Sequence, residues 1–254
     1  MKILLNSTKT MDTGTASRLK TTDPEFASEA AELAAALKPL SKDRLLEEFD
    51  LTRNTLPVAR TRLARWGEAD NPRLPAVLAF TGLVYKHLRA GEWTAAQRRR
   101  AQNNLRIISA LYGLLRPLDA IEAYRLEMGV RWRPPTAANL TAFWKPRLTT
   151  ALNDEMKDGE PVIDLASREY AKAVDVKDLR GAVISPVFKE TRPDGTLKTA
   201  PVHAKMARGA MVRWLITHAA RRPEDLLGFG ELGWEASSEP PQEGKWLFTR
   251  PADR

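Results

Sequence analysis

The segment of 27 residues from position 103 to position 129 constrains the fold of this chain more than any other part of its sequence. It opens with apolar residues spaced three or four positions apart, namely Leu105, Ile108, Leu111, Tyr112 and Leu115. This spacing predicts a helix that ends at the turn formed by Arg116 and Pro117. The remainder of the segment is rich in charged residues, namely Asp119, Glu122, Arg125 and Glu127. A segment that is half apolar and half charged contributes to the core and to a surface, and we expect the function at that surface.

Composition excludes several classes of protein. The chain has 254 residues, enough for one large or two small domains, and its 43% hydrophobic and 28% charged residues are typical of a globular protein. It has no cysteine, so disulfides, thiol catalysis and thiolate metal sites are excluded. No run of eighteen apolar residues is present, and the N-terminus has only three consecutive apolar residues, too few for a signal peptide. We therefore expect a cytoplasmic protein without a membrane partner.

The net charge of +8 is distributed unevenly along the chain. Residues 53–65 carry four arginines and no acid, residues 98–133 carry eight arginines against three acids, and residues 205–222 carry five cations and no acid. Blocks of one sign attract polyanions, although each block alone is also consistent with a solvated helix face. Three such blocks in one chain favour a phosphate-bearing partner.

The hydrophobic pattern predicts an α+β fold. Helices are expected over residues 25–37, 41–49 with Ser41 as N-cap, 54–66, 75–88, from Thr94 into the central segment, 140–156 and 205–222. Strands are expected over residues 2–5, 161–165, 182–189 and 196–202, near Trp234 and over 246–249, with a turn at 192–195. The first strand finds partners only in the second half of the chain. We therefore predict a single interwoven domain over residues 1–254, with a helix-rich N-terminal half and a mixed sheet completed by the C-terminal half.

The predicted helix from residue 205 carries one candidate phosphate site. Its core face is expected to hold Ala207, Met211, Trp214, Leu215 and His218. Lys205, Arg208 and Gly209 lie on the opposite side near the helix N-terminus, where backbone N–H groups favour an anion. The alternative is that these two cations are simply solvated.

The ends of two predicted strands carry another candidate site. Lys9 lies in a polar loop after the first strand, and Asp164, Ser167 and Tyr170 follow a later strand. If both strands belong to one sheet, Lys9, Asp164 and Ser167 converge at its carboxyl edge. No P-loop, catalytic triad or dinucleotide fingerprint is present, and the three histidines have no ligand spacing. We therefore expect neither a metal nor a cofactor, and direct iron binding is the least favoured interpretation.

Seven segments carry motifs that keep their order along nearly the whole chain: LNSTKTMD (5–12), AFTGLVY (79–85), LRIISALYGLLRPLDAIEAYRLEMG (105–129), LTAFW (140–144), VIDLASREYAKAV (162–174), SPVFKE (185–190) and AKMARGAMVRWLI (204–216). Together they resemble the YaaA family of peroxide stress response proteins. The resemblance implies a distinctive α/β fold with an element similar to a helix-hairpin-helix, duplex DNA binding through a positive groove, and a role in limiting iron-driven oxidative damage.

The resemblance also indicates where the hairpin lies. Ser109, Ala110 and Gly113 are the candidate hairpin residues, with Ala110 where relatives often have glycine. Residues 89–91 are an equally defensible hairpin. The N-terminal motif departs from the family too, because many relatives read Ser-Pro-Ala-Lys where this chain has Asn6-Ser7-Thr8-Lys9.

Two functional hypotheses follow. The leading one is a DNA-binding protein whose cations contact phosphates without reading bases; the candidate contacts are Lys9, Arg98, Arg99, Arg100, Arg106, Arg116, Arg125, Lys189, Lys205 and Arg208. The alternative is an enzyme acting on a nucleotide or a small phosphorylated substrate, in which Lys9, Arg116, Lys205 and Arg208 clamp phosphate and Asp164 or Glu127 acts as acid or base. A deep pocket where these residues meet favours the enzyme, whereas an open positive groove favours DNA. Neither hypothesis predicts an oligomeric state.

Overall fold

The first strand of the chain lies inside the sheet. The computed structural model describes residues 1–12, 14, 17–239 and 242–252. Strand β1 (Lys2–Asn6) pairs in parallel with β3 (Leu105–Ser109) on one side and with β6 (Val162–Asp164) on the other, and Ile3 faces both Leu105 and Ile163. Strands enclosed in this way are apolar on both faces, as the buried Ile3, Leu4 and Leu5 show. The predicted N-terminal strand is confirmed, but the prediction that only the second half of the chain pairs with it is wrong, because β3 lies in the first half and only β6 in the second.

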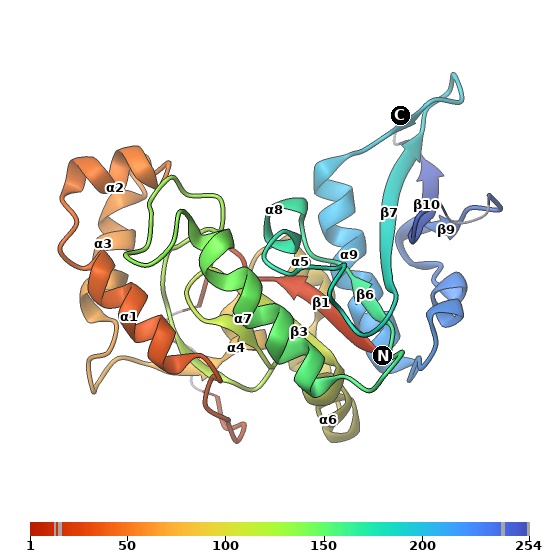
Figure 1. The fold of residues 1–254 in the computed structure, drawn as a ribbon. Helices are drawn as coiled ribbons and strands as arrows, with labels where there is room; N and C mark the ends of the chain where they lie inside the picture. The colour runs from red at the N-terminus through yellow and green to blue at the C-terminus, as the bar shows by residue number, and fades with distance from the viewer. Residues whose placement is uncertain (13, 15–16, 240–241, 253–254) are drawn as a thin grey trace.

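The main sheet is mixed and combines strands from both halves of the chain (Figure 1). Its order is β4-β3-β1-β6-β7-β10-β9, with β8 paired to β7. The remaining strands are β4 (Gly113–Leu115), β7 (Val183–Thr191), β8 (Leu197–Lys198), β9 (Glu235–Ala236) and β10 (Lys245–Pro251). β4, β8 and β9 are antiparallel to their neighbours. A separate antiparallel pair joins β2 (Arg73–Pro75) to β5 (Ala120–Glu122). The predicted α+β class is confirmed.

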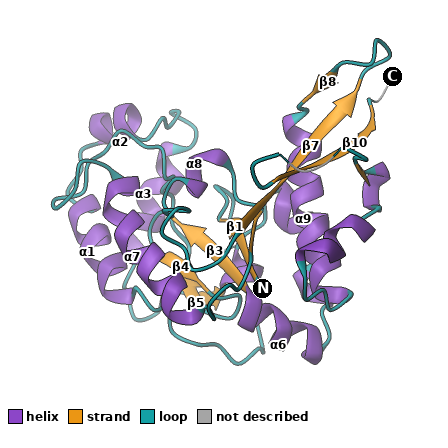
Figure 2. Ribbon diagram, turned by 45° about the vertical axis from the view of Figure 1, so that its right-hand side comes forward, coloured by secondary structure: helices purple, strands orange, loops and turns teal. Residues whose placement is uncertain are grey.

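Helices cover both faces of this sheet (Figures 1 and 2). α1 (Ala27–Leu37) and α7 (Leu140–Glu155) lie on one side, and α6 (Ala95–Asn104) and α9 (Pro201–Thr217) lie on the other. The other helices are α2 (Lys42–Glu48), α3 (Leu56–Arg65), α4 (Ala76–Ala79), α5 (Leu83–Leu88) and α8 (Arg168–Ala171), with 3₁₀ turns at Ala90–Glu92, Pro223–Gly228 and Glu231–Gly233. Within the described ranges, none of the helices has the length and apolar character needed to cross a membrane.

The expected helix caps are present. The Ser41 hydroxyl accepts a hydrogen bond from the backbone N–H of Arg44, and Thr94 forms a reciprocal capping box with Gln97. The predicted turn at residues 192–195 also forms, with the Gly195 N–H bonded to the Arg192 carbonyl. These features depend on neighbours in the sequence, which is why they were predictable.

The central segment corrects the sequence prediction. Residues 105–115 form strands β3 and β4 with a tight turn between them, and the predicted helix is wrong. Every residue from Leu105 to Leu115 is buried, so the apolar spacing did not mark one face. A fully buried apolar run fits a strand as well as a helix, and the β-branched Ile107 and Ile108 favour the strand.

Three other predicted boundaries are wrong. The helix predicted over 75–88 is split into α4 and α5, because the loop after β1 forms hydrogen bonds with the residues between them. The Asp12 N–H donates to the Ala79 carbonyl, and the Thr81 N–H donates to the Thr10 carbonyl. The strand predicted over 196–202 is only two residues long, because α9 already begins at Pro201, a position that proline favours. α9 ends at Thr217, so His218 is exposed and stacks on Trp214 instead of facing the core.

The turn between β3 and β4 is not a DNA-binding hairpin. The Ser109 hydroxyl accepts the N–H groups of Leu111 and Tyr112 at 3.2 and 2.9 Å, and the Trp144 indole donates to the Ala110 carbonyl at 2.8 Å. Strands flank this turn, and its amides are buried and already bonded. The assignment of Ser109, Ala110 and Gly113 to a helix-hairpin-helix is therefore wrong.

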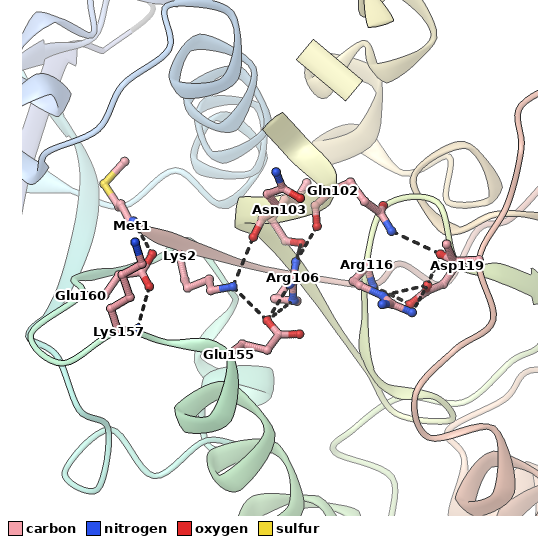
Figure 3. Close-up of polar contacts among 12 residues, drawn as sticks. Met1, Lys2, Gln102, Asn103, Arg106, Arg116, Asp119, Glu155, Lys157 and Glu160 are labelled. Atoms are coloured by element: carbon pink, nitrogen blue, oxygen red, sulfur yellow. Dashed lines mark hydrogen bonds and ion pairs between the residues drawn. The ribbon is translucent and has the colours of Figure 1, made fainter. Parts of the chain in front are cut away.

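A group of ion pairs fastens the opposite, amino edge of the sheet (Figure 3). The Glu155 carboxylate, at the end of α7, lies 2.6 Å from the Arg106 guanidinium and 3.0 Å from the Lys2 ammonium. Burial by itself would raise the pKa of Glu155, but the hydrogen bonds and charges of Arg106 and Lys2 outweigh it and lower that pKa. Arg106 is only 4% exposed, so it has a structural role and not the predicted phosphate contact.

Removal of the Glu155 charge tests this role. Glu155→Gln leaves two buried cations without a counter-charge, and we expect the free energy of unfolding to fall by about 2–3 kcal/mol at neutral pH. Because the pKa of Glu155 is lowered in the folded state, its contribution is present above the ordinary carboxyl pKa and is lost as the pH falls through the lowered value. Urea unfolding at neutral and acid pH measures both effects. Asp154→Asn, an exposed charge change in the same helical turn, is the control and should be near neutral.

The turn at Gly113 provides a second stability test. Gly113 has a φ of +68°, and a Cβ there would lie 2.5 Å from the Trp144 ring. Gly113→Ala should therefore lower the free energy of unfolding by about 2–4 kcal/mol, the sum of left-handed strain and overpacking. Gly195→Ala is the control, because Gly195 has a φ of +81° with no atom within 4 Å, and strain alone should cost about 1–2 kcal/mol. Equal losses in the two variants would contradict the proposed packing against Trp144.

Candidate functional site

The loops after β1 and β6 meet at the carboxyl edge of the sheet. The Leu165 N–H donates to the Leu4 carbonyl at 2.9 Å, and the Ser167 N–H donates to the Asn6 side-chain oxygen at 2.8 Å. Carboxyl ends of adjacent parallel strands are the usual place for a ligand in open α/β sheets. A cavity of about 340 Å³, the edge cavity, opens here; it is lined by residues 6–10, 82–84, 167, 169 and 170 and by Lys205 and Arg208.

Three of the predicted phosphate-binding cations line the edge cavity. The Lys9 ammonium is paired with the Glu127 carboxylate at 2.6 Å, and its side chain remains 58% exposed. Lys205 is exposed and Arg208 is half-buried, and neither forms a hydrogen bond or an ion pair with any residue in the described part of the chain. α9 begins one turn before Lys205, so the positive charge here comes from side chains and not from the helix N-terminus as predicted.

Asp164 lies close enough to Arg208 for their charges to interact. Burial raises the pKa of Asp164 to about 6, and a hydrogen bond from the Ala166 N–H and the charge of Arg208 oppose that rise. Burial lowers the pKa of Arg208, and Asp164 acts in the opposite direction. The predicted convergence of Lys9, Asp164 and Ser167 at one edge is what the structure shows, since Lys9 and Ser167 line the cavity and Asp164 interacts with its arginine.

Hydroxyl groups form the floor of the edge cavity. Ser7 is 3% exposed, and its hydroxyl partly offsets the rise that burial causes in the pKa of the nearby Tyr124 and Tyr170 phenols. The Tyr124 phenol also bonds to the Ser109 hydroxyl at 2.8 Å, and burial raises the pKa of Tyr124 to about 12. The floor is therefore neutral and protonated at physiological pH. Sequence reasoning missed Ser7 and Tyr124, because nothing in the sequence distinguishes a buried hydroxyl pair from core residues.

A second cavity of about 360 Å³, the carboxylate cavity, adjoins the first. It shares Lys9 and Glu169 with the edge cavity and is also lined by residues 48–50, 127 and 129–131. The Glu169 carboxylate accepts a hydrogen bond from the Gly129 N–H at 2.6 Å. Glu127 lies between Lys9 and Arg125, at 2.6 and 2.8 Å. Glu127 therefore holds Lys9 in place, which is a different role from the acid–base role considered for it.

The other predicted cations do not join this site. α6 leads into the amino end of β3, so Arg98, Arg99 and Arg100 lie toward the opposite edge; Arg98 bonds to the Trp93 carbonyl and Arg100 to the Ile216 carbonyl. Arg116 bonds to the buried Asp119 at 3.1 Å, and Lys189 lies on β7. The ten predicted cations therefore do not form one surface, and Arg116 is not part of a phosphate clamp with Lys205 and Arg208.

Two short connections between helices are candidates for a hairpin. Residues 89–91 join α5 to α6; Arg89 has a φ of 53° and Gly91 is exposed, with no atom within 4 Å of where a Cβ would lie. This second candidate has a helix on each side, as the motif requires. The α2–α3 connection, which sequence reasoning did not consider, contributes Phe49 and Asp50 to the carboxylate cavity.

The histidines are dispersed. His87 lies on α5, His203 contacts Glu190 at 2.6 Å, and His218 stacks on Trp214. Among the described residues, no group of three or more His, Cys, Asp or Glu is arranged to hold a metal ion.

Asp164 provides a test of the site by stability. Because its pKa is raised in the folded state, the stability of the protein should fall as the pH rises from the ordinary aspartate pKa to about 6. Asp164→Asn keeps an acceptor for the Ala166 N–H, and we expect it to increase the free energy of unfolding by about 1–3 kcal/mol at neutral pH, with no increase at acid pH. Thermal unfolding across this pH range measures the difference, with the exposed Asp178→Asn as control. A loss of stability at neutral pH would show instead that Asp164 is a stabilising partner of Arg208.

Comparisons with known proteins place the chain in a family. Residues 1–239 match the family model described as "Peroxide stress protein YaaA". A UPF0246 protein of Paraburkholderia xenovorans is 38% identical over 98% of both chains, and one of Bordetella avium is 39% identical over 100% of both. A UPF0246 protein of Maricaulis maris is 39% identical over 99% of this chain and 96% of its own. The family model and the full-length matches agree, and the chain belongs to the YaaA family of peroxide stress proteins.

Proposed function

We propose that this member of the family is a cytosolic protein that binds duplex DNA through its phosphates, without base-specific readout, and thereby limits iron-driven oxidative damage. The observation that supports the proposal is the edge cavity, where Arg208 and Lys205 lack a hydrogen-bonded counter-charge in the described part of the chain. These two cations lie on α9, and the sheet brings Lys9, from the loop after β1, to the same edge.

An arginine that lines a cavity without a hydrogen-bonded partner among the described residues favours an anionic ligand there. A guanidinium has five N–H donors in a planar fork that matches phosphate, and half-burying it without a partner is unfavourable. A bound phosphate satisfies these donors with charge-assisted hydrogen bonds, which are among the strongest in proteins. The hydroxyls of Ser7 and Tyr170 add neutral groups to the same cavity.

The structure also supports a second contact with DNA, outside the edge cavity. α5 starts at the edge cavity, and its other end leads directly into the hairpin at residues 89–91. Its six residues span about 9 Å, and duplex DNA presents several phosphates over such a length. We propose that the backbone of this hairpin, at the exposed Gly91, contacts the DNA backbone next to the phosphate held by Arg208.

A second function is favoured by the concave shape of the site. An enzyme acting on a nucleotide or a small phosphorylated substrate would use Lys9, Lys205 and Arg208 to hold phosphate. Asp164, with its pKa raised to about 6 by burial, would exchange a proton near neutral pH. Arg116 and Glu127, which the sequence analysis assigned to this enzyme site, have no role in the enzyme hypothesis as the structure supports it.

Charge-removing substitutions test the DNA proposal. Lys205→Gln and Arg208→Gln should each weaken duplex binding by about tenfold at low salt, because each removes a charge-assisted phosphate contact. Each should also reduce the slope of log affinity against log salt by about one. Fluorescence anisotropy with a labelled duplex at several salt concentrations measures both quantities.

Arg99→Gln is the matched control, because Arg99 is exposed and lies toward the opposite edge of the sheet. We expect it to bind like the unmodified protein. Salt-insensitive or undetectable duplex binding would rule out the DNA proposal. If mononucleotides then raise the melting temperature, the enzyme takes its place.

A further inference from the structure

The edge cavity and the carboxylate cavity adjoin, and they differ in charge. Lys9 and Glu169 line both of them. Lys205 and Arg208 line only the edge cavity, and Glu48 and Glu127 line only the carboxylate cavity. Each cavity is in the size range of small-molecule sites, about 300–1,000 Å³. A ligand that fills both must be anionic at one end and offer hydrogen-bond donors at the other.

The carboxylate cavity retains acceptor capacity. One oxygen of Glu169 accepts a hydrogen bond from the Gly129 N–H. Because an ionised carboxylate has about four acceptor positions, others remain available to a ligand. Arg131, which also lines this cavity, donates to the Glu47 carbonyl at 2.5 Å and forms no hydrogen bond with Glu169 among the described residues. Donors from a ligand would fit here, as sugar hydroxyls and base amino groups do.

Lys9 lies between the edge cavity and the carboxylate cavity. Its ammonium is held by Glu127 at 2.6 Å while its side chain stays exposed to both cavities. A phosphate beside Arg208 would be within reach of a flexible lysine of this kind, and the attached nucleoside would then extend past it toward Glu169. Gly129 permits this arrangement, because a Cβ there would lie 3.0 Å from the Glu169 carboxylate.

We propose that the two cavities together bind one nucleoside monophosphate unit, with the phosphate at Lys205 and Arg208 and the sugar and base donors at Glu169. This inference rests on the proposed phosphate site in the edge cavity and adds a nucleoside site in the carboxylate cavity. Inorganic phosphate, or the phosphate of a stacked duplex, occupies only the edge cavity. A free mononucleotide and an unpaired nucleotide of DNA have the same chemistry and fit the same site.

Calorimetric titration of the full-length chain tests the inference with adenosine monophosphate, adenosine and inorganic phosphate. We expect the mononucleotide to bind at least about tenfold more tightly than inorganic phosphate, because it adds contacts in the second cavity. Glu169→Gln keeps an acceptor for the Gly129 N–H but removes the charge, and it should bring the mononucleotide to within about threefold of phosphate without weakening phosphate itself. Arg208→Gln should weaken both. Glu68→Gln, an exposed charge change at a residue that lines neither cavity, is the control, and equal melting temperatures show that the variants fold.

Equal affinities for the mononucleotide and phosphate, or an unchanged mononucleotide affinity in Glu169→Gln, would overturn the inference while leaving the phosphate site intact. Failure of both phosphate and duplex DNA to bind would overturn the proposed function as well. A duplex with unpaired terminal nucleotides shows whether the bound nucleoside monophosphate belongs to DNA or is a free mononucleotide. If the protein binds this duplex more tightly than a blunt duplex, the bound nucleotide belongs to DNA. If it binds the two duplexes equally, the ligand is the free mononucleotide.

Discussion

The parallel pairing of β1 with β3 and β6 is the constraint on which the rest of this structure depends. β1 comes from the first residues of the chain, and its partners come from positions more than 100 residues later. Parallel strands share a carboxyl edge, so this pairing brings the loop that carries Lys9 next to the loop that carries Ser167. The same edge receives α9 with Lys205 and Arg208. Without that pairing the cations would lie on unrelated surfaces.

The two edges of the sheet use their charges differently. At the amino edge, Glu155 neutralises Arg106 and Lys2, and the three side chains satisfy one another (Figure 3). At the carboxyl edge, Arg208 interacts with the charge of Asp164 but forms no hydrogen bond or ion pair with any described residue. Paired buried charges hold a fold together, whereas an under-neutralised cation in a cavity destabilises it unless a ligand binds. This contrast separates structural arginines from candidate binding arginines, which a count of positive charges does not.

Sequence reasoning succeeded where neighbouring residues decide the outcome. The N-caps at Ser41 and Thr94 formed as predicted, and so did the helix predicted over residues 140–156, which ends one residue earlier. It failed for residues 105–115, because a segment buried on all sides has no polar face to reveal its period. It failed for His218 because the end of α9 was placed too late. Of the ten predicted phosphate contacts, only Lys9, Lys205 and Arg208 share the cavity, because spatial grouping is decided by the sheet.

The sequence by itself determined the α+β class, the first strand, the family and the surplus of cations, since each depends on composition, local pattern or motif order. Tertiary structure alone decided that Ser109–Gly113 is a buried β-turn and that Arg106 is a structural residue. It also decided that Ser7, Glu169 and Arg208 border one continuous site. The physical reason is that burial and the distance between charges depend on which distant segments pair, and no local pattern encodes that pairing.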